Sequence, residues 1–274
     1  MRALVQENGS RSASIVEIPT PKLEDNDVLV KIEYVAQNPT DWKHIAQNSP
    51  PGSIIGCDCS GTLVSLGSAL KNPSLKLGDR VAGCVHGGLF KDKGAFAEYA
   101  KVESDLMWKV PDAIKMENAA MFATAWMTAA QALVLSQGHS FPPEIVPGSP
   151  WYLIYGGSTS VGLFTTQLAK LMGYRIIVTA SPHSFELVKS QGADEVVDYH
   201  DGDKASAEIR RITGGGVDLA FDTVSEGDSF KIAVATFGER GGQLNCVLPP
   251  SEEAKALRKN VKNEMQMMLT QFGI

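Results

Sequence analysis

The sequence predicts an α/β protein with two domains, a β-rich domain at residues 1–115 and a doubly wound domain at residues 116–274. Short β-branched runs separated by Gly, Pro, Asn and Asp fill the first part. In the second part, apolar strand-like runs alternate with helix-like segments. This alternation is typical of βαβ units, in which helices cover both faces of a parallel sheet.

Length, composition and charge limit the classes of protein to which the chain can belong. Its 274 residues can form two ordinary domains, and 43% hydrophobic with 20% charged residues is the balance of a folded globular protein. Lys+Arg 25 against Asp+Glu 31 gives a net charge of −6 without any cationic run, which argues against nucleic-acid binding. The apolar stretches are shorter than the roughly 20 residues of a membrane-spanning helix, and the start MRALVQENGSRS lacks an apolar signal core. We therefore expect a cytoplasmic protein that does not associate with membranes.

The first domain is expected to hold strands within residues 27–36, 61–67 and 79–87. The segment QNPTDWKH at residues 37–44 is expected to be a loop, and its mixture of polar and aromatic side chains is typical of binding loops. Lys43 could direct its ammonium group towards a carbonyl oxygen or a phosphate. The alternative is a solvated Lys43 beside a packed Trp42.

The second domain should begin with a long helix at residues 116–137, followed by a Gly- and Pro-rich connection at 137–150. Strands are expected within 151–157, 175–181, 195–201, 218–226 and 241–249, and helices within 160–173, 183–193 and 229–237. Residues 252–270 are ambiguous, because Leu257, Val261, Met265 and Met268 fit one helical face.

A glycine-rich turn joins the first strand of this domain to its helix. Gly156-Gly157 ends the strand and Gly162 lies within the first turn of the helix, a layout that brings backbone N–H groups against a dinucleotide pyrophosphate. Thr159 and Ser160 stand where glycine is common, so the pattern alone also fits an ordinary turn between a strand and a helix.

The end of the next strand bears on the choice of cofactor. NAD sites usually place Asp or Glu there, whereas this chain continues without a carboxylate through Ser181-Pro182-His183-Ser184. These residues, with Lys189 and Tyr199, suit a ribose 2′-phosphate and favour NADPH. The alternative is that Ser181-Pro182 only starts a helix and that Tyr199 belongs to the core.

Other chemistries have little support in the sequence. Cys57, Cys59, Cys84 and Cys246 form no CxxC pair, so we expect four thiols and no zinc site. No G-x-S-x-G motif is present to anchor a hydrolase triad. The scattered residues His44, His86 and His139 are more typical of surface or core positions than of catalysts.

Several segments together resemble the medium-chain dehydrogenase/reductases, in their zinc-free, quinone-oxidoreductase-like branch. They are MRALV, DVLVKIEYVAQNPTDWK, IIGCDCSGTLVSLG, LKLGDRVAG, GAFAEYAKV and WKVP, together with the second domain. The resemblance implies a GroES-like substrate domain followed by a Rossmann cofactor domain. Zinc enzymes of the family have Cys in place of Asn38 and Gly-His-Glu in place of Gly56-Cys57-Asp58, so the resemblance implies a metal-free reductase.

Within that branch, NPTDWKH, YGGSTSVG, TASPHSFELVKSQGADEVVDYHD and AFDTVSE resemble the stand-alone, trans-acting enoyl reductases that partner fungal polyketide synthases. The resemblance implies an NADPH site lined by Thr40, Asp41, Trp42, Lys43, Ser158, Thr159, Ser160, Val161, Ser181, Pro182, His183, Ser184, Tyr199, Val247 and Leu248. It implies an acyl substrate bordered by Trp126, Met127, Thr128, Ala129, Ala130, Gln131, Ala132 and Leu133. Lys43 and Thr128 are then the candidates for binding and polarising the substrate.

The expected activity is hydride transfer from NADPH to the β-carbon of an α,β-unsaturated thioester, carried on the acyl carrier of a polyketide synthase. The alternatives are a quinone or small-enone reductase and a non-catalytic NADPH-binding protein. Family chains continue beyond a segment like residues 261–273, so we expect the C-terminal complement of the first domain to be missing. The resemblance also favours a short helix and a strand within 252–270, and a monomer or homodimer.

Overall fold

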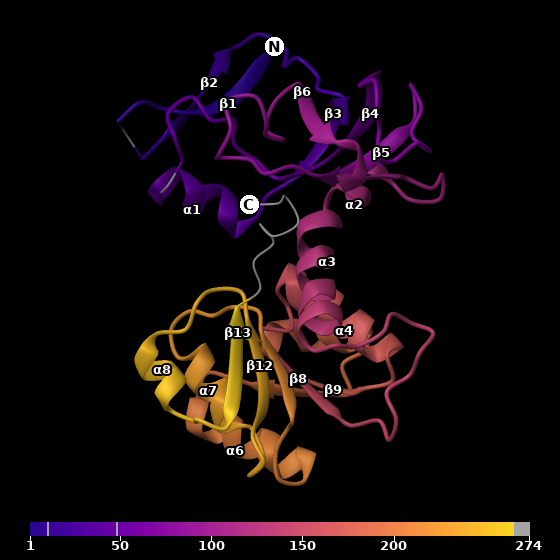
Figure 1. Ribbon diagram of the computed structural model, residues 1–274. Coiled ribbons are helices and arrows are strands. Elements are labelled where there is room, and N and C mark those ends of the chain that lie inside the picture. The colour runs from indigo at the N-terminus through magenta and orange to yellow at the C-terminus, as the bar shows by residue number, and fades with distance from the viewer. Residues whose placement is uncertain (10, 48, 266–274) are drawn as a thin grey trace. The chain divides into compact units, whose positions relative to one another are not determined.

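The computed structural model describes residues 1–9, 11–47 and 49–265. The chain forms two compact units, one of Met1–Thr124 and a second that begins at Ala125 (Figure 1). The change in sequence pattern at residue 116 precedes this boundary, because helix α2 (Met116–Ala120) packs on the strands of the first unit. Met116 and Ala119 lie in an apolar cluster with Ala82 and Val110 of that unit.

The first unit is built on a five-stranded antiparallel sheet in the order β6-β3-β4-β5-β7. A separate hairpin pairs β1 with β2. The strands are β1 (Arg2–Gln6), β2 (Ala13–Glu17), β3 (Asp27–Ala36), β4 (Asp58–Leu66), β5 (Arg80–Cys84), β6 (Tyr99–Glu103) and β7 (Met107–Lys109), with a 3₁₀ turn at Ser104–Leu106. Val28, Val30, Leu63, Val81 and Val102 are buried together and form the core of this sheet. The predicted strands of the first domain are confirmed.

Residues 39–47 form helix α1 (Pro39–Gln47), so the predicted loop at 37–44 is wrong. The Asn38 backbone N–H donates to Asp41 Oδ2 (2.7 Å), and the Asp41 N–H donates back to the Asn38 carbonyl oxygen (3.0 Å). These reciprocal bonds satisfy groups at the start of the helix. Pro39 suits the first helical position, where a missing N–H has no cost. The polar composition of the segment concealed this start signal.

The second unit holds a six-stranded parallel sheet in the order β10-β9-β8-β11-β12-β13. Its strands are β8 (Trp151–Tyr155), β9 (Arg175–Ala180), β10 (Glu195–Asp198), β11 (Leu219–Asp222), β12 (Gly242–Cys246) and β13 (Val261–Met265). Its helices include α4 (Ser160–Leu171), α5 (Phe185–Ser190), α6 (Gly202–Thr213), α7 (Ser229–Ala235) and α8 (Glu252–Ala256), with a 3₁₀ turn at Pro182–Ser184.

Helices cover both faces of this sheet. Ile209 of α6 and Phe230 of α7 pack on one face with Leu153, whereas Leu168 of α4 and Val188 of α5 pack on the other (Figure 1). Strand residues of alternating orientation therefore enter two separate cores, as a doubly wound arrangement requires. The predicted fold class is confirmed.

The long helix expected at 116–137 is wrong as a continuous element. It consists of α2, α3 (Ala123–Ala130) and a π-helical segment (Gln131–Ser136). At the other end, α8 and β13 confirm the short helix and strand that the resemblance favours. Leu257 lies outside α8, and Met268 lies outside the described residues.

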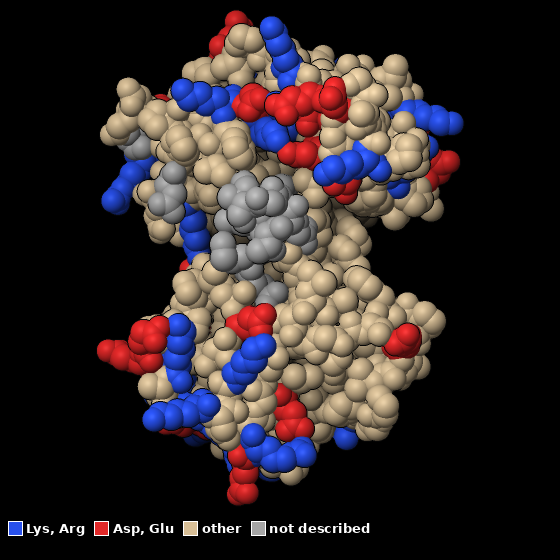
Figure 2. All heavy atoms as spheres, viewed as in Figure 1, with Lys and Arg blue, Asp and Glu red and all other residues tan. Residues whose placement is uncertain are grey.

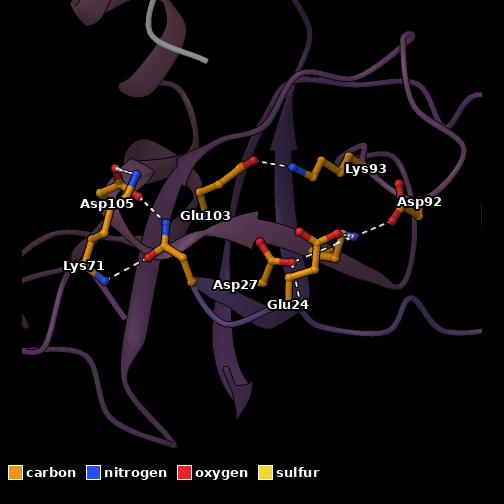
Figure 3. Close-up of polar contacts among 9 residues, drawn as sticks. Glu24, Asp27, Lys71, Asp92, Lys93, Glu103 and Asp105 are labelled. Carbon is orange, nitrogen blue, oxygen red and sulfur yellow. Dashed lines mark hydrogen bonds and ion pairs between the residues drawn. The ribbon is translucent and has the colours of Figure 1, made fainter. Parts of the chain in front are cut away.

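The four cysteines are buried free thiols, as predicted. On the face shown in Figure 2, acidic and basic side chains lie among one another, without a large area of one sign. The Lys101 side chain, by contrast, is buried. Its ammonium group pairs with Asp92 and lies 3.8 Å from Asp27 Oδ2 and 3.7 Å from Glu24 Oε1, three acidic residues that are labelled in Figure 3. None of the helices in the described part of the chain has the length and apolar character that a bilayer crossing requires.

Candidate functional site

A cavity of about 820 Å³ opens at the carboxyl ends of the parallel strands in the second unit. The chain runs from β8 outwards to β9 and β10, then returns to add β11 on the opposite side of β8. Ligands of doubly wound sheets bind at such a reversal of strand order. The cavity wall includes the predicted residues Gly156, Ser158, Thr159 and Tyr199.

The turn after β8 requires glycine at three positions. Gly156 has φ +81°, and a Cβ there would lie 2.6 Å from Val224 Cγ2. A Cβ on Gly157 would lie 2.7 Å from Val178 Cβ, and one on Gly162 would lie 2.3 Å from the Gly156 carbonyl oxygen. Close packing within the protein therefore requires glycine at these positions, as it does in the glycine-rich turns of dinucleotide-binding domains.

Helix α4 begins at this turn, and Thr159 is its N-cap. The Gly162 N–H donates to Thr159 Oγ1 (2.9 Å), which explains why threonine takes a position often filled by glycine. Ser160 and Val161 are the first two helical residues, so their N–H groups have no carbonyl partner within the helix. Together with the helix dipole, they suit the pyrophosphate of a dinucleotide.

Ser181, which follows β9, has features of both roles considered for it, a cofactor contact and the start of a helical turn. Ser181 Oγ lies 3.1 Å from the Tyr199 hydroxyl, and the Tyr199 ring stacks on His200 at 4.6 Å between centroids. Ser181 also precedes the 3₁₀ turn, and Tyr199 packs against the core. Ser181 thus precedes a helical turn and Tyr199 packs on the core, as the alternative interpretation expected, while their two hydroxyl groups lie side by side beyond the carboxyl ends of β9 and β10.

Several predicted cofactor residues of this unit do not line the cavity. His183 and Lys189 are exposed, Ser184 is buried, and Val247 and Leu248 are half-buried after β12. The sequence-based prediction missed Asp201, Asp203, Glu226, Asp228 and Lys231, which line the cavity. Their place after the carboxyl ends of β10 and β11 is the signal that could have identified them.

In the first unit, α1 carries the predicted residues Thr40 to Lys43. Trp42 is 58% exposed, so the alternative of a packed Trp42 is wrong. Lys43 is half-buried, and its ammonium group lies 5.5 Å from the centre of the Trp42 ring. Asp41 is buried and its carboxylate caps the helix, and burial raises its pKa above the usual range.

Asp58 is a second buried carboxylate in this unit, and the sequence-based prediction gave it no role. It accepts hydrogen bonds from Asn38 Nδ2 (3.0 Å), from the Thr124 N–H (3.0 Å) and from the Thr124 hydroxyl (2.5 Å). Burial raises the pKa of Asp58 to about 6, despite these bonds. Burial also raises the pKa of Cys59 to about 12, so that thiol stays protonated.

The predicted substrate residues 126–133 lie in α3 and the π-helical segment of the second unit. Thr128 and Gln131 are buried, and the Trp126 ring lies edge-on to Phe164 at 6.4 Å. Ala132 and Leu133 are fully buried in the core between the sheet and α4, which gives them a packing role. Lys43 and Thr128, the two candidate catalytic residues, belong to different units.

None of the three histidines singled out in the sequence lines the cavity at the glycine turn. His139 Nε2 lies 2.8 Å from the Tyr174 hydroxyl, and burial lowers its pKa. The His44 and His86 rings meet edge to face at 5.3 Å. Among the described residues, no group of three His, Cys, Asp or Glu side chains could hold a metal ion.

The chain matches two family profiles. Residues 24–112 match the alcohol dehydrogenase GroES-like domain, and residues 160–273 match the zinc-binding dehydrogenase family. Among solved structures, an alcohol dehydrogenase superfamily protein from Novosphingobium aromaticivorans is 26% identical, with a TM-score of 0.82 over 99% of this chain and 80% of that one. A mycobacterial protein complexed with NADPH is 25% identical, with a TM-score of 0.80 over 98% and 82%.

Relatives of higher identity come from fungi. The trans-enoyl reductase TOXD of Cochliobolus carbonum is 39% identical over 274 residues, which cover 99% of this chain and 90% of the relative. The trans-enoyl reductase ACTTS2 of Alternaria alternata is 42% identical over 90% of this chain and 72% of the relative. These similarities confirm the resemblance found in the sequence. The chain belongs to the trans-enoyl reductase family of the medium-chain dehydrogenase/reductases, with a GroES-like domain followed by a Rossmann domain.

Proposed function

We propose that this chain is an NADPH-dependent trans-enoyl reductase that acts on the α,β-unsaturated thioester of a growing polyketide. The observation that carries the proposal is the glycine turn at the N-terminus of α4, placed where the strand order reverses, in a chain whose relatives are named trans-enoyl reductases. Its proposed partner is the acyl carrier of a polyketide synthase in the cytoplasm.

The choice of NADPH over NADH rests on the end of β9. An NAD site needs a carboxylate to accept the ribose 2′-hydroxyl. Here β9 ends at Ala180, and the hydroxyl groups of Ser181 and Tyr199 lie 3.1 Å apart. Two hydroxyl groups can donate hydrogen bonds to a 2′-phosphate without repelling it. His183 and Lys189 are further candidates for donors to this phosphate.

The chain's own residues have limited tasks in this reaction. When bound, NADPH supplies the hydride that adds to the β-carbon, and a proton then joins the α-carbon. Gly156, Ser160 and Val161 would hold the pyrophosphate with backbone groups. We assign Lys43 and Thr128 to binding and polarising the thioester carbonyl, on which negative charge develops. Orientation and charge stabilisation then account for catalysis without a nucleophile.

A quinone reductase is the second candidate, because the quinone oxidoreductase of Coxiella burnetii is 26% identical with a TM-score of 0.78 over 97% of this chain and 82% of that one. The test uses the purified full chain and follows NADPH absorbance with a carrier-bound enoyl thioester, its pantetheine analogue and a free quinone. We expect oxidation with the thioesters, fastest on the carrier. Turnover with the quinone alone would favour the second candidate.

Thermal unfolding with NADPH or NADH separates binding from catalysis, because a ligand of the folded state raises its stability by RT ln(1 + [L]/Kd). We expect a larger rise with NADPH. A rise without turnover of any acceptor would support a non-catalytic binding protein, and no rise with either nucleotide would overturn the proposed site.

A further inference from the structure

The turn after β11, residues Thr223 to Ser225, is bonded to the strand ends on both sides of it. β11 lies between β8 and β12 in the sheet. Thr223 bonds to the glycine turn after β8, and Ser225 bonds to the residue after β12. Both contacts are made by side-chain hydroxyl groups, so they depend on the residue type and not only on the path of the backbone.

Thr223 completes a chain of hydrogen bonds through the glycine turn. Its Oγ1 lies 2.8 Å from the Tyr155 carbonyl oxygen, 3.0 Å from that of Gly156 and 2.8 Å from Thr159 Oγ1. Carbonyl oxygens only accept, so Thr223 donates to them and Thr159 donates to Thr223. Thr159 in turn accepts from the Gly162 N–H. The 6%-exposed Thr223 thereby connects both ends of the glycine turn.

Ser225 has an unusual backbone conformation that the buried carboxylate of Asp222 maintains. Its φ is +54°, which is uncommon for a residue other than glycine. Asp222 Oδ1 accepts the N–H groups of Ser225 (2.9 Å) and Val224 (3.0 Å), and Oδ2 accepts the Ser229 hydroxyl (2.7 Å). In this conformation Ser225 Oγ accepts the Val247 N–H at 3.0 Å. A glycine would relieve the strain but would lose this bond.

The sheet order assigns the two bonds to opposite halves of a dinucleotide. The pyrophosphate lies at the start of α4, and Ser181 and Tyr199 mark the adenosine half beyond β9 and β10. The nicotinamide half then extends over β11 and β12, where Val247 follows β12. We propose that Thr223 and Ser225 are positioning residues, with Thr223 holding the pyrophosphate turn and Ser225 holding Val247 and Leu248 at the nicotinamide end. This inference rests on the proposed use of NADPH.

The test compares two ligands by calorimetry, NADPH and 2′-phospho-ADP-ribose, which lacks the nicotinamide. We expect Thr223→Val to raise Kd about tenfold for both ligands, because each retains the pyrophosphate. Thr223→Ser, which keeps the hydroxyl, should restore Kd to within about twofold of the parent value. Ser225→Ala should raise Kd for NADPH about fivefold and leave that of 2′-phospho-ADP-ribose unchanged.

Thr236→Val is the matched control for Thr223→Val, since Thr236 is also buried and its hydroxyl donates to the Ala233 carbonyl oxygen (2.6 Å) within α7. Equal effects of these two variants would overturn the role of Thr223. Equal weakening of both ligands by Ser225→Ala would overturn the role of Ser225, and Ser225→Gly provides the same comparison without backbone strain. Binding of NADPH without reductase activity would contradict the proposed reaction and leave this test intact.

Discussion

Asp58 accepts two hydrogen bonds from Thr124, a residue 66 positions later in the chain, and its other oxygen accepts one from Asn38. Asn38 precedes α1, and Thr124 lies in the first turn of α3. One buried carboxylate of the first unit therefore connects the residue before α1 with Thr124, the last residue of the described part of that unit. Its burial makes the strength of this connection depend on pH.

Asp58→Asn should change how stability depends on pH between about 4 and 6. Burial raises the pKa of Asp58 from 3.8 to about 6, so in this window the folded protein holds a proton that the unfolded chain has lost. The contribution of Asp58 to the unfolding free energy therefore falls as pH rises. The variant lacks this loss, and its stability relative to the parent should rise by ~2 kcal/mol across the window. Urea unfolding at several pH values measures this difference, and a constant difference would contradict the prediction.

Asp79→Asn is a control of opposite sign. Burial opposes ionisation of Asp79, but hydrogen bonds from Lys109 and from the Lys76 N–H, together with the charges of both lysines, outweigh it and lower the pKa of Asp79. This group stabilises the folded state above its unfolded pKa of about 3.8 and loses that contribution as pH falls further. As pH rises towards about 4, the parent gains unfolding free energy that the variant does not gain. The difference between the two should therefore grow below about pH 4 and stay constant above it.

Lys101→Met should destabilise the first unit by about 3 kcal/mol, because it leaves the Asp27 carboxylate buried without its cation. The Lys101 side chain is 2% exposed and that of Asp27 is 4% exposed, and Lys101 Nζ lies 3.8 Å from Asp27 Oδ2. The double variant Lys101→Met/Asp27→Asn should recover most of the loss. Lys71→Met removes an exposed pair with Asp105 at 3.4 Å and should cost no more than about 0.5 kcal/mol. Equal urea midpoints for the two lysine variants would count against a buried ion pair.

Gly156→Ala should abolish the stabilisation that NADPH confers, because the new Cβ would lie 2.6 Å from Val224 Cγ2 and would displace the turn. Gly214→Ala is the matched control. Gly214 also has a positive φ, +73°, but a Cβ there meets nothing within 4 Å. It should cost about 1 kcal/mol of stability and keep the full NADPH-dependent rise in Tm. The same rise in both variants would show that the turn does not hold the cofactor.

Ser181→Asp should shift the preference from NADPH towards NADH. The new carboxylate would repel a 2′-phosphate and could accept a ribose 2′-hydroxyl. We expect kcat/KM for NADPH to fall about a hundredfold, which corresponds to ~3 kcal/mol. Ser190→Asp, on the exposed end of α5, is the control for added charge and should leave the preference unchanged. An unaltered ratio for Ser181→Asp would remove Ser181 from the cofactor site.

Lys43→Ala should lower kcat for the enoyl thioester about tenfold while NADPH affinity stays within about twofold, because the ammonium group is assigned to the substrate carbonyl. Lys22→Ala, at an exposed position, should change neither value. Steady-state rates and calorimetric Kd values distinguish the two effects. Unchanged turnover would exclude Lys43 from the mechanism.

The sequence predicted those features that depend on neighbours along the chain. β-branched runs at 27–36 and 175–180 are strands, because strand pleating acts within a few residues. The glycine pattern also located the turn after β8, where Gly156 has a positive φ of +81°. The contacts that exclude a side chain at Gly156 and Gly157 come from Val224 and Val178, which the sequence pattern did not reveal. The sequence-based prediction was wrong at α1, where the polar composition concealed a helix start. It was also wrong at 116–137, where the helical pattern continued across the turn at 121–122 that separates α2 from α3.

The tertiary structure decided which distant groups meet. The parallel sheet places Thr223 against Tyr155, 68 residues earlier, and the antiparallel sheet of the first unit presents Asp58 to Thr124. Sequence periodicity describes which face of a strand is buried, but not which strand lies beside it. The cavity wall at Asp201, Glu226 and Lys231 and the strained Ser225 depend on that strand order, since hydrogen bonds and close packing act only between groups that the fold has brought into contact.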